Sequence, residues 1–458
     1  MRATVQLYDD IAESDAALSS HPDTTLIRAL RDRGYPSNEI VYLSLGETWD
    51  SVAPGLVDCL RTAVPRFAHG YTLSPYGLPA LRHRLHEMVT REHELARHEG
   101  RYTVAVSQAG TRGTMADFAR LLRRLPDRGS PAGTPVALIP SPGWDYASLL
   151  AAQGYRVLGY PIIDEGGRFG PDIESAIDLL RSTTAHSPVL LVVNAQHNPT
   201  GWDWGPDRVT ALLRAACSHR ANVVIDDAYY SVHDPHRQPT NALLTQLDTA
   251  EDNTHWLAVR SLGKQYQANG WGIGSMVGPP ATVDRLVEST TTRSYGSAIP
   301  LQAAMSDWIE NHESQLHTEE FRGTIAAHRL HAATRLAELL PGEDIVSPGD
   351  CTTYMRVAVP TREVPESAAA AQLIRDRFVR ELAMRTGVVL GRGSMTDAVD
   401  AETPGASRTA WVRMHIGVPR HVLDEGLERI AGFLEGWNPS GGDRDVRGTY
   451  SRTIESPT

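Results

Sequence analysis

The stretch Arg260-Ser-Leu-Gly-Lys-Gln-Tyr-Gln-Ala-Asn-Gly-Trp-Gly-Ile-Gly-Ser-Met-Val-Gly278 contains Lys264, the only lysine in a chain of 458 residues. All the other basic residues among the 44 are arginines. Arginine stays protonated, whereas a desolvated lysine can lose its proton and become a nucleophile. Lys264 is therefore the first candidate for a residue that forms a Schiff base. The alternative is a genome depleted in lysine that left one by chance, and the neighbouring motifs must decide.

Composition limits the classes of protein to consider. The length predicts two closely connected domains. A net charge of −11 and a pI of about 5.9 argue against nucleic acid as a partner. No signal peptide is evident, and no apolar run approaches the roughly 18 residues that span a membrane. The three scattered cysteines fit a reducing cytoplasm, and the absence of HExxH and CxxC argues against a metal site.

Strands and helices alternate through the first two thirds of the chain. Apolar strands are expected at 40–47, 102–107, 135–139, 156–161, 188–193, 222–230 and 256–259. Helical spacing occurs at 24–33, 56–64, 78–92, 115–124, 172–181 and 206–218, with a further helix ending at Gln153. This alternation predicts a mostly parallel sheet covered on both faces, with ligands bound at the carboxyl ends of its strands.

The last third of the chain predicts a smaller α+β unit. A long helical region is expected at 301–340, strands near 355–359 and 411–416, and a closing helix at 421–434. The insert Ser394–Ser407 is rich in small and acidic residues and is expected to be a mobile loop. The tail from Asn438 is polar and glycine-rich, so disorder is expected there.

Four polar motifs occur at the ends of expected strands. They are Asn198-Pro-Thr-Gly201, Asp226-Asp-Ala-Tyr229, Ser261-Leu-Gly-Lys264 and Trp411-Val-Arg413-Met-His-Ile416. Taken singly, each has an ordinary structural explanation such as a turn. The arginine is harder to dismiss, because burying it without an anion costs several kcal/mol.

In this order and spacing, the motifs resemble those of the class I/II aminotransferases, which are pyridoxal-phosphate enzymes of fold type I. The aspartate aminotransferase and aminocyclopropane-carboxylate synthase branches are the familiar examples, and the resemblance covers roughly residues 40–435. It implies an α/β fold with a large domain built on a mostly parallel, seven-stranded type of sheet, and a smaller α+β domain. The expected boundaries are an arm and part of the small domain at 1–66, the cofactor domain at 67–305, the small domain at 306–437 and the tail at 438–458.

The resemblance also implies roles for particular residues. Lys264 would hold the cofactor as an internal aldimine and move the Cα proton, and Asp226 would pair with the pyridine nitrogen, with Asp227 the alternative if the register is off by one. Asn198 and Tyr229 would donate to the phenolic oxygen, and Trp144 would stack on the ring. The phosphate would lie against Ala109, Gly110, Thr111, Arg112 and Ser261. Arg413 would bind the substrate carboxylate, with Gly46, Asn198 and Trp144 also lining the substrate site.

Three positions depart from the family pattern. Gly272 stands where an arginine that binds the phosphate is usual, so Arg112 or Arg260 is expected to replace it. Thr48-Trp49 replaces the proline turn after Gly46-Glu47, and Glu47 and Trp49 either line the substrate site or pack at a strand end. Arg293 is a candidate reader of an acidic substrate group.

Tyr71 and Ser297 match positions that reach the neighbouring subunit's site, which implies a homodimer with shared active sites.

The expected reaction is transamination of an α-amino acid. The alternative is a specialised biosynthetic enzyme that catalyses elimination, replacement, cyclisation or oxidation, for example on S-adenosylmethionine or arginine. Ser-x-x-Lys also occurs in penicillin-binding proteins and class A β-lactamases, but these need a later Lys-Thr-Gly that a chain with one lysine cannot supply. Residues 1–40 are too short and too acidic for the DNA-binding module of an aminotransferase-like regulator.

Overall fold

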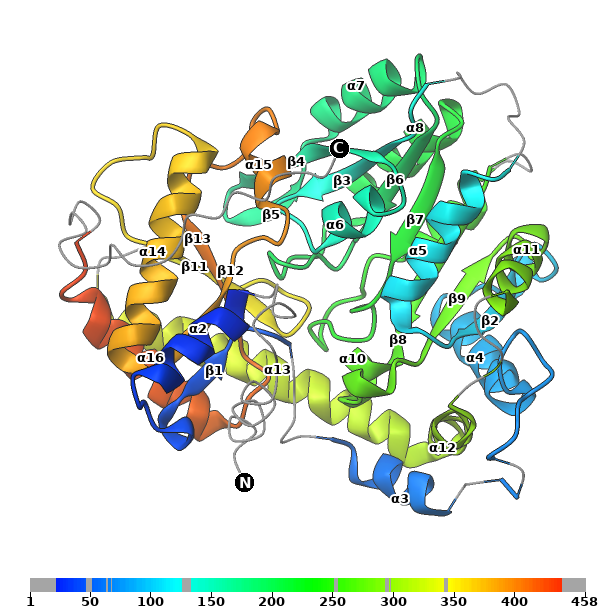
Figure 1. Ribbon diagram of the computed structural model, residues 1–458, viewed down its shortest axis with the longest axis horizontal. Helices are drawn as coiled ribbons and strands as arrows, with labels where there is room; N and C mark the ends of the chain where they lie inside the picture. The colour runs from blue at the N-terminus through cyan, green and yellow to red at the C-terminus, as the bar shows by residue number, and fades with distance from the viewer. Residues whose placement is uncertain are drawn as a thin grey trace.

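The chain folds around two β-sheets that a long helix, α13 (His312–Leu339), connects along one side (Figure 1). A computed structural model describes residues 22–46, 52–62, 65–66, 68–125, 133–250, 254–292, 296, 298–341 and 345–438. Four residues with predicted roles, Glu47, Trp49, Arg293 and Ser297, lie outside these ranges, as does the tail 439–458. Within these ranges no helix is long and apolar enough to cross a lipid bilayer.

The larger sheet has eight strands. In spatial order they are β2 (Thr103–Ser107), β9 (Gly274–Gly278), β8 (Trp256–Ser261), β7 (Asn222–Asp226), β6 (Val189–Val193), β3 (Val136–Ser141), β4 (Arg156–Glu165) and β5 (Arg168–Pro171). The five central strands from β8 to β4 pair in parallel, whereas β9 is antiparallel to both of its neighbours and β5 is antiparallel to β4. The predicted mostly parallel sheet is confirmed, with β5 as an additional edge strand.

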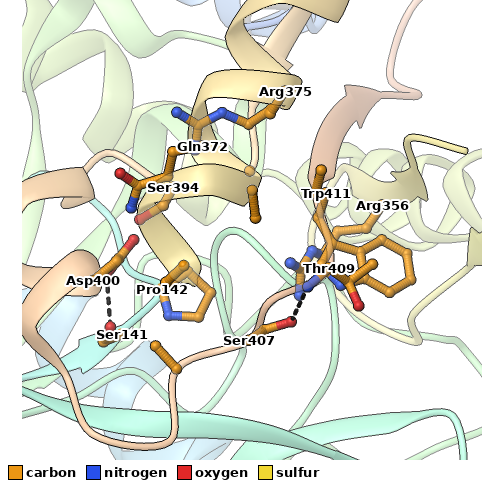
Figure 2. A pocket seen from close by; sticks show the side chains of 15 residues that line it. Ser141, Pro142, Arg356, Gln372, Arg375, Ser394, Asp400, Ser407, Thr409 and Trp411 are labelled. Atoms are coloured by element: carbon orange, nitrogen blue, oxygen red, sulfur yellow. Dashed lines mark hydrogen bonds between the residues drawn. The ribbon is translucent and has the colours of Figure 1, made fainter. Parts of the chain in front are cut away.

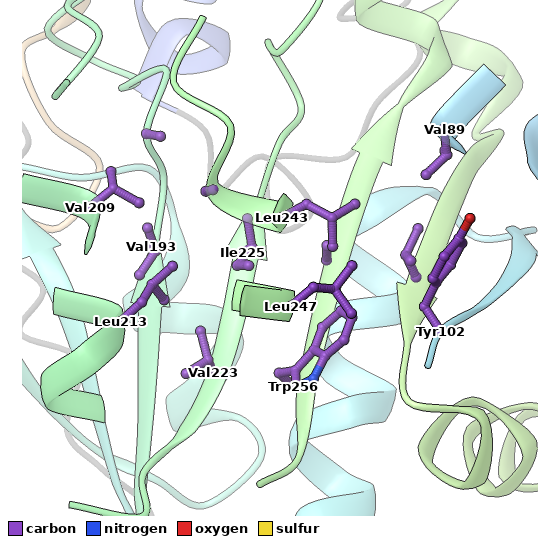
Figure 3. Close-up of a cluster of buried hydrophobic side chains, with 14 of the residues drawn as sticks. Val89, Tyr102, Val193, Val209, Leu213, Val223, Ile225, Leu243, Leu247 and Trp256 are labelled. Carbon is purple, nitrogen blue, oxygen red and sulfur yellow. The ribbon is translucent and has the colours of Figure 1, made fainter. Parts of the chain in front are cut away.

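Helices cover both faces of this sheet because the strands are apolar on both sides. One face packs against α5 (Gly110–Leu122), α6 (Tyr146–Ala151) and α11 (Pro280–Thr291). The other packs against α4 (Pro79–Glu92), α7 (Ile173–Thr184), α8 (Pro206–Ser218), α9 (Ala242–Thr249) and α12 (Ile299–Glu310). Figure 3 shows part of this second core, where Ile225 and Trp256 of the sheet face Leu243 and Leu247 of α9.

The smaller sheet draws its strands from both ends of the chain. Its order is β1 (Val41–Leu43), β12 (Val388–Arg392), β13 (Trp411–His415), β11 (Tyr354–Ala358) and β10 (Val346–Ser347). Around it lie α2 (Pro22–Asp32), α14 (Ala368–Thr386), α15 (Asp397–Glu402) and α16 (Arg420–Leu434) (Figure 1). The helix α3 (Pro54–Thr62) instead packs on α12, beside the larger sheet. The domain boundaries themselves stay predictions.

The prediction that Ser394–Ser407 is a mobile loop is wrong. This segment contains α15, and Asp400 is buried in it. Asp400 Oδ1 accepts hydrogen bonds from the Ser141 hydroxyl at 2.7 Å and the Thr396 hydroxyl at 2.9 Å. Small polar residues suggested solvent exposure, but here they satisfy an acidic side chain and pin the segment to the end of β3.

Several predicted element ends also shift. The helix expected from Met115 begins at Gly110, because the Ser107 hydroxyl donates to Gly110 O at 2.8 Å and ties the first turn to β2. The strand expected to reach Tyr230 ends at Asp226, whose Oδ1 accepts from the Ala228 amide at 3.2 Å and turns the chain. The strand β4 continues to Glu165, where two glycines of positive φ lead into β5. The long helical region is divided at Asn311, which caps α13.

One buried arginine on α13 holds the loop before β11. The Arg329 guanidinium donates to the carbonyls of Pro348, Cys351, Thr352 and Tyr354 at 2.7–3.0 Å. Burial lowers the pKa of Arg329. A single side chain thus satisfies four backbone acceptors that have no regular sheet partner there, and it fixes the start of the strand that carries Tyr354.

The substitution Arg329→Met is expected to lower the free energy of unfolding by about 2–4 kcal/mol, because it leaves buried carbonyls without donors. Urea denaturation followed by circular dichroism measures this. Arg335→Met is the matched control on the same helix, since its partners Glu338 and Glu428 are on the surface; a change within about 0.5 kcal/mol is expected. Equal losses in the two variants would contradict this role of Arg329.

Candidate active site

The carboxyl ends of the parallel strands meet the smaller sheet, and most of the predicted site residues gather there. Lys264 is on α10 (Leu262–Tyr266), directly after β8. Asp226 ends β7, Asn198 is in the loop after β6, and Arg413 is on β13. These residues come from four separate segments of the chain, so their convergence is a property of the fold rather than of local sequence.

Alternation along β7 distinguishes Asp226 from Asp227. Val224 packs in the core beneath α5, whereas Ile225 packs in the core on the opposite face. Successive side chains point to opposite faces, so Asp226 faces the α5 side and Asp227 the other. The structure therefore places Asp226, and not Asp227, on the side where the first turn of α5 and Trp144 lie.

Asp226 is buried and held by Tyr146 of α6. The Tyr146 hydroxyl donates to Asp226 Oδ2 at 2.6 Å. Burial raises the pKa of Asp226, while the hydrogen bonds from Tyr146 and the Ala228 amide and the charge of Lys264 oppose that rise. A buried carboxylate in this state is stabilised by a cationic N–H partner.

A direct hydrogen bond joins Asn198 to Arg413. Arg413 Nη1 donates to Asn198 Oδ1 at 2.8 Å, and Nη2 donates to Ser44 O at 3.1 Å. Because Asn198 Oδ1 is an acceptor here, its Nδ2 is left to donate elsewhere. Arg413 Nε is buried without an acceptor among the described residues. The guanidinium therefore keeps donor capacity for an anion.

Lys264 lies against the backbone of Gly46. Its Nζ donates to Gly46 O at 3.4 Å, and Asn269 Nδ2 donates to the same oxygen at 3.1 Å. A Cβ on Gly46 would overlap the Tyr354 hydroxyl and lie 3.2 Å from Tyr229 Oη. Only glycine fits where this segment of the chain crosses the lysine and the two tyrosines.

The two tyrosines form a buried pair. The Tyr229 hydroxyl donates to Tyr354 Oη at 3.2 Å, and Arg413 lies over the Tyr354 ring at 4.1 Å. Burial alone would raise the pKa of Tyr354, but Arg413, Lys264 and the hydrogen bond from Tyr229 together bring it below its ordinary value. Burial and the neighbouring Tyr354 raise the pKa of Tyr229. The pair therefore separates into a donor, Tyr229, and an acceptor, Tyr354.

The first turn of α5 forms the opposite wall. Ala109, Gly110, Thr111 and Arg112 follow one another there, and Gly110 N donates to Gly272 O at 2.7 Å. Ser261 caps α10, its hydroxyl accepting from Lys264 N at 3.4 Å. Arg112 lies over the Trp144 ring at 4.4 Å, and its Nη1 donates to Asp145 Oδ2 at 2.8 Å.

Arg260 lies on the other face of β8. Ala258 shares its face and packs in the core that faces α9, whereas Ser261 follows Val259 toward α5. The Arg260 guanidinium pairs with Glu92 at 2.6 Å and donates to Gln265 Oε1 at 2.7 Å. Of the two arginines expected to replace the one missing at Gly272, the structure places Arg112 beside Gly110 and Arg260 away from it.

Tyr71 is not part of this cluster. Its side chain is 77% exposed, and that of the nearby Leu73 is 92% exposed. The partner-subunit role of Tyr71 stays a prediction, and that of Ser297 falls outside the described residues.

Three residues of the site had no predicted role. Tyr146 holds Asp226, Tyr354 pairs with Tyr229, and Asn194 bridges two loops by donating to Asp226 O at 2.8 Å and accepting from Asn198 N at 3.0 Å. Tyr146 lies two residues after Trp144, and Asn194 lies four residues before Asn198, so both were within motifs that the sequence pointed to. Tyr354 had none, because the sequence does not show that β11 pairs with the strand that carries Arg413.

Comparison with known proteins identifies the family. The sequence profile described as "Aminotransferase class I and II" matches residues 57–430. The chain belongs to this family. It is 25% identical over 301 residues to an LL-diaminopimelate aminotransferase of Dehalococcoides mccartyi, covering 65% of this chain and 69% of that protein. It is 26% identical over 326 residues to the glutamate-pyruvate aminotransferase AlaC of Escherichia coli, covering 68% and 71%.

The fold agrees with this assignment. A mutant aspartate aminotransferase of Thermus thermophilus superposes with a TM-score of 0.71 at 22% identity, covering 94% of this chain and 99% of that one. The predicted fold type I architecture is confirmed, and the protein is a pyridoxal-phosphate-dependent enzyme of the aminotransferase family. The matched relatives are named as aminotransferases, which favours transamination over elimination, replacement, cyclisation or oxidation.

The residues of this aminotransferase fit pyridoxal phosphate. The site supplies the lysine amine, a buried carboxylate that forms no ion pair within the described residues, and an asparagine amide whose Nδ2 is left to donate. Gly110 and Gly272 lie back to back without side chains at the amino end of α5, which leaves room for an anion at a helix terminus.

The substitution Gly46→Ala is expected to lower kcat/KM by about 100-fold, because the new methyl group displaces Tyr354 and the backbone that contacts Lys264. Steady-state kinetics measures this. Gly270→Ala is the control in the lysine loop, where an added Cβ meets nothing within 4 Å, and it is expected to keep wild-type turnover. Similar losses of kcat/KM in both variants would contradict a specific steric requirement for glycine at position 46.

Asp227 predicts a pH dependence of stability. Burial and the neighbouring Asp226 raise the pKa of Asp227 to about 7, and neither of its side-chain oxygens has a hydrogen-bond partner among the described residues. Between about pH 4 and pH 7 the folded protein keeps a proton that the unfolded chain has released. Stability is therefore lost as the pH rises to 7, by up to roughly 1.4 kcal/mol per pH unit.

The variant Asp227→Asn is expected to gain stability relative to wild type as the pH rises from 5 to 8, because its side chain cannot ionise. Urea denaturation at four pH values measures the difference. Asp178→Asn, at an exposed site on α7, is the control and should differ from wild type by the same amount at each pH. A constant difference for Asp227→Asn would contradict the burial of an ionisable carboxylate.

Proposed function

We propose that this enzyme transfers the amino group of an α-amino acid to a 2-oxo acid at a site centred on Lys264. The observation that carries the proposal is the convergence of Lys264, Asp226 and the Asn198–Arg413 pair at the carboxyl ends of the parallel strands. Pyridoxal phosphate supplies an electron sink for the Cα of the bound amino acid. The protein's own groups must then hold the cofactor, orient the substrate and move one proton.

Lys264 is proposed as the group that holds the cofactor and carries the proton. Its amine is the only one of its kind in the chain and is half-buried beside Gly46 O and the Tyr229 ring. Lys264 Nζ would hold pyridoxal phosphate, and the same amine, when not bonded to the cofactor, would take up and give back the Cα proton, which is general acid–base catalysis. Gly46 O limits where Nζ can move.

Asp226, Asn198 and Tyr229 are proposed to set the electronic state of the cofactor ring. Asp226, buried and fixed by Tyr146, pairs with the ring nitrogen and keeps it protonated. The Asn198 amide is oriented by Arg413 so that Nδ2 would donate to the phenolic oxygen. The Tyr229 hydroxyl would be a second donor if its one proton turned from Tyr354 Oη to that oxygen. Trp144, next to the end of β3, stacks on the ring.

The phosphate is proposed to bind at the first turn of α5. Backbone N–H groups of Ala109, Gly110 and Thr111, with the Ser261 hydroxyl, form the cup. Arg112 is proposed to supply the cation that Gly272 lacks. Its guanidinium is half-exposed and, among the described residues, forms its ion pair with Asp145, whereas that of Arg260 forms an ion pair with Glu92 on the opposite face.

Arg413 is proposed to bind the α-carboxylate of the substrate through its remaining donor capacity. Gly46, Asn198 and Trp144 complete the substrate site. The named relatives act on diaminopimelate or on glutamate and pyruvate, all of which offer a carboxylate next to the reacting carbon.

A homodimer with shared active sites is inferred from the exposed segment at Tyr71 and Leu73, since two large apolar side chains this exposed are typical of an interface. The three unpaired cysteines support a reducing compartment, the cytoplasm.

A single-turnover experiment tests the proposed reaction. The holoenzyme is mixed with one amino acid at a time and no 2-oxo acid, and the cofactor is then extracted and analysed by mass spectrometry. One equivalent of pyridoxamine phosphate and one of 2-oxo acid per site are expected for the correct donor. Recovery of unchanged pyridoxal phosphate after substrate has been consumed would contradict transamination.

Two variants test the residue roles. Lys264→Ala is expected to abolish turnover. Arg413→Gln is expected to lower kcat/KM by roughly 10- to 150-fold, the equivalent of losing a charge-assisted hydrogen bond of about 1.5–3 kcal/mol. Arg420→Gln, an exposed arginine just after β13, is the control and is expected to match wild type.

A further inference from the structure

A pocket lies between the end of β3 and the smaller sheet, outside the cluster around Lys264. The empty space in it, including the part that is open to solvent, is about 410 Å³, and Figure 2 shows the side chains that line it. Ser141 ends β3 of the larger sheet and Pro142 follows it, whereas Arg356 and Trp411 are on β11 and β13 of the smaller sheet. Ser394 and Ser407 lie in the segment between β12 and β13. Small residues of α14, of the position after β12 and of the position before β13 leave the space open: Ala368, Ala371, Gly393 and Ala410.

The central feature of this pocket is a buried arginine without an acceptor. Arg356 is only 3% exposed. Within the ranges that the structure describes, it makes no hydrogen bond or ion pair, and Nε and Nη1 are buried and unpartnered. Its guanidinium lies over the rings of Phe169 at 4.7 Å and Trp411 at 4.6 Å, which meet edge to face. The aromatic rings fix its plane but cannot accept its N–H groups in the plane.

Two neighbouring arginines have the hydrogen-bond acceptors that Arg356 lacks among the described residues. Arg375, in the same pocket wall, is paired with Asp376 and Asp397 at 2.7–2.9 Å. Arg413, directly opposite Arg356 in the pairing of β11 with β13, is bound to Asn198 and Ser44. The guanidiniums of Arg375 and Arg413 thus each have hydrogen-bond acceptors, and among these three arginines Arg356 alone has none within the described residues.

Asp400, the acid with the largest electrostatic effect on Arg356, forms no ion pair with it. Asp400 acts on it only through space, because the Asp400 carboxylate is hydrogen-bonded to the hydroxyls of Ser141 and Thr396. Burial lowers the pKa of Arg356 to about 9, so the side chain is still a cation at neutral pH. A desolvated cation without an anion is costly, which makes a bound anion the natural partner.

The surroundings favour a singly charged anion. The Asp400 carboxylate in the wall repels a dianion such as phosphate, and one unpaired guanidinium balances one negative charge. The planar guanidinium, packed against two aromatic rings, matches the planar carboxylate. Ser407 adds a hydroxyl that accepts from Thr409 N at 3.2 Å and keeps its own proton to donate (Figure 2).

We propose that this pocket is a binding site for a small carboxylate, separate from the Lys264 centre, in which the carboxylate pairs with Arg356. None of the residues that line it belongs to the cluster of Lys264, Asp226, Asn198, Tyr229 and Arg413. The bound molecule would touch both sheets, Pro142 on one side and Arg356 on the other.

Acetate is the probe, and inorganic phosphate is the comparison. Each is titrated into the holoenzyme in a non-carboxylate buffer at constant ionic strength, with binding followed by calorimetry and by the thermal midpoint. Acetate is expected to bind saturably and raise the midpoint, and phosphate to have a smaller effect. An equal or larger effect of phosphate would overturn the assignment to a carboxylate.

The variant Arg356→Met is expected to weaken acetate binding at least tenfold and, without acetate, to melt at or above the wild-type temperature, because a buried unpaired charge is removed. A midpoint several degrees lower than wild type would assign Arg356 a structural role and overturn the proposal. So would acetate binding equal to wild type.

Two further variants keep the test independent of folding and of the proposed reaction. Ala368→Leu narrows the pocket from the first turn of α14 and is expected to weaken acetate binding at least tenfold with Arg356 intact; unchanged binding would overturn the proposal. Arg413→Gln is expected to retain acetate binding. Loss of acetate binding in Arg413→Gln would show that acetate binds at the Lys264 centre instead. Because the readout is binding, failure of transamination would leave this result unaffected.

Discussion

The hydrogen bond from Arg413 to Asn198 is the contact on which the arrangement of the site depends. It joins the strand β13 of the smaller sheet to the loop after β6 of the larger one. Through Asn194, the same loop is tied to Asp226, and through Ser44, the same arginine is tied to the segment that ends at Gly46. A single pair of side chains therefore sets the relative positions of the groups proposed to contact cofactor and substrate.

Side-chain alternation divides the polar residues of the larger sheet into two environments. Asp226 and Ser261 face the helix that begins at Gly110, whereas Asp227 and Arg260 face the opposite core. Adjacent residues of the same chemical type thus have different surroundings, and Asp227 is left with a pKa of about 7. The residues proposed to bind the cofactor lie on the α5 face of the sheet, and the ion pair between Arg260 and Glu92 lies on the opposite face.

The sequence predicts the larger sheet well because its strands are apolar runs that end at polar motifs, and the order of those motifs is distinctive. It predicts the insert at 394–407 poorly, since small and acidic residues look solvated until Asp400 meets Ser141 across the fold. The roles of Tyr354 and Arg356 depend on which strands pair in the smaller sheet, and one sequence without its pairing partners does not contain that register. The sequence shows that Gly272 departs from the family pattern. Which arginine could replace the missing one depends on the face of β8 on which Arg260 lies, and that face is known only from the structure.

The pairing of β1 with β12 has a consequence for synthesis on the ribosome. Val41 to Leu43 leave the ribosome early, yet their partners Val388 to Leu390 follow near the end of translation. Gly46, immediately after β1, can reach its place beside Lys264 and Tyr354 only once that late strand has formed. The larger sheet can fold while the chain grows, but the catalytic centre closes after synthesis is nearly complete, so truncated translation products lack a finished site.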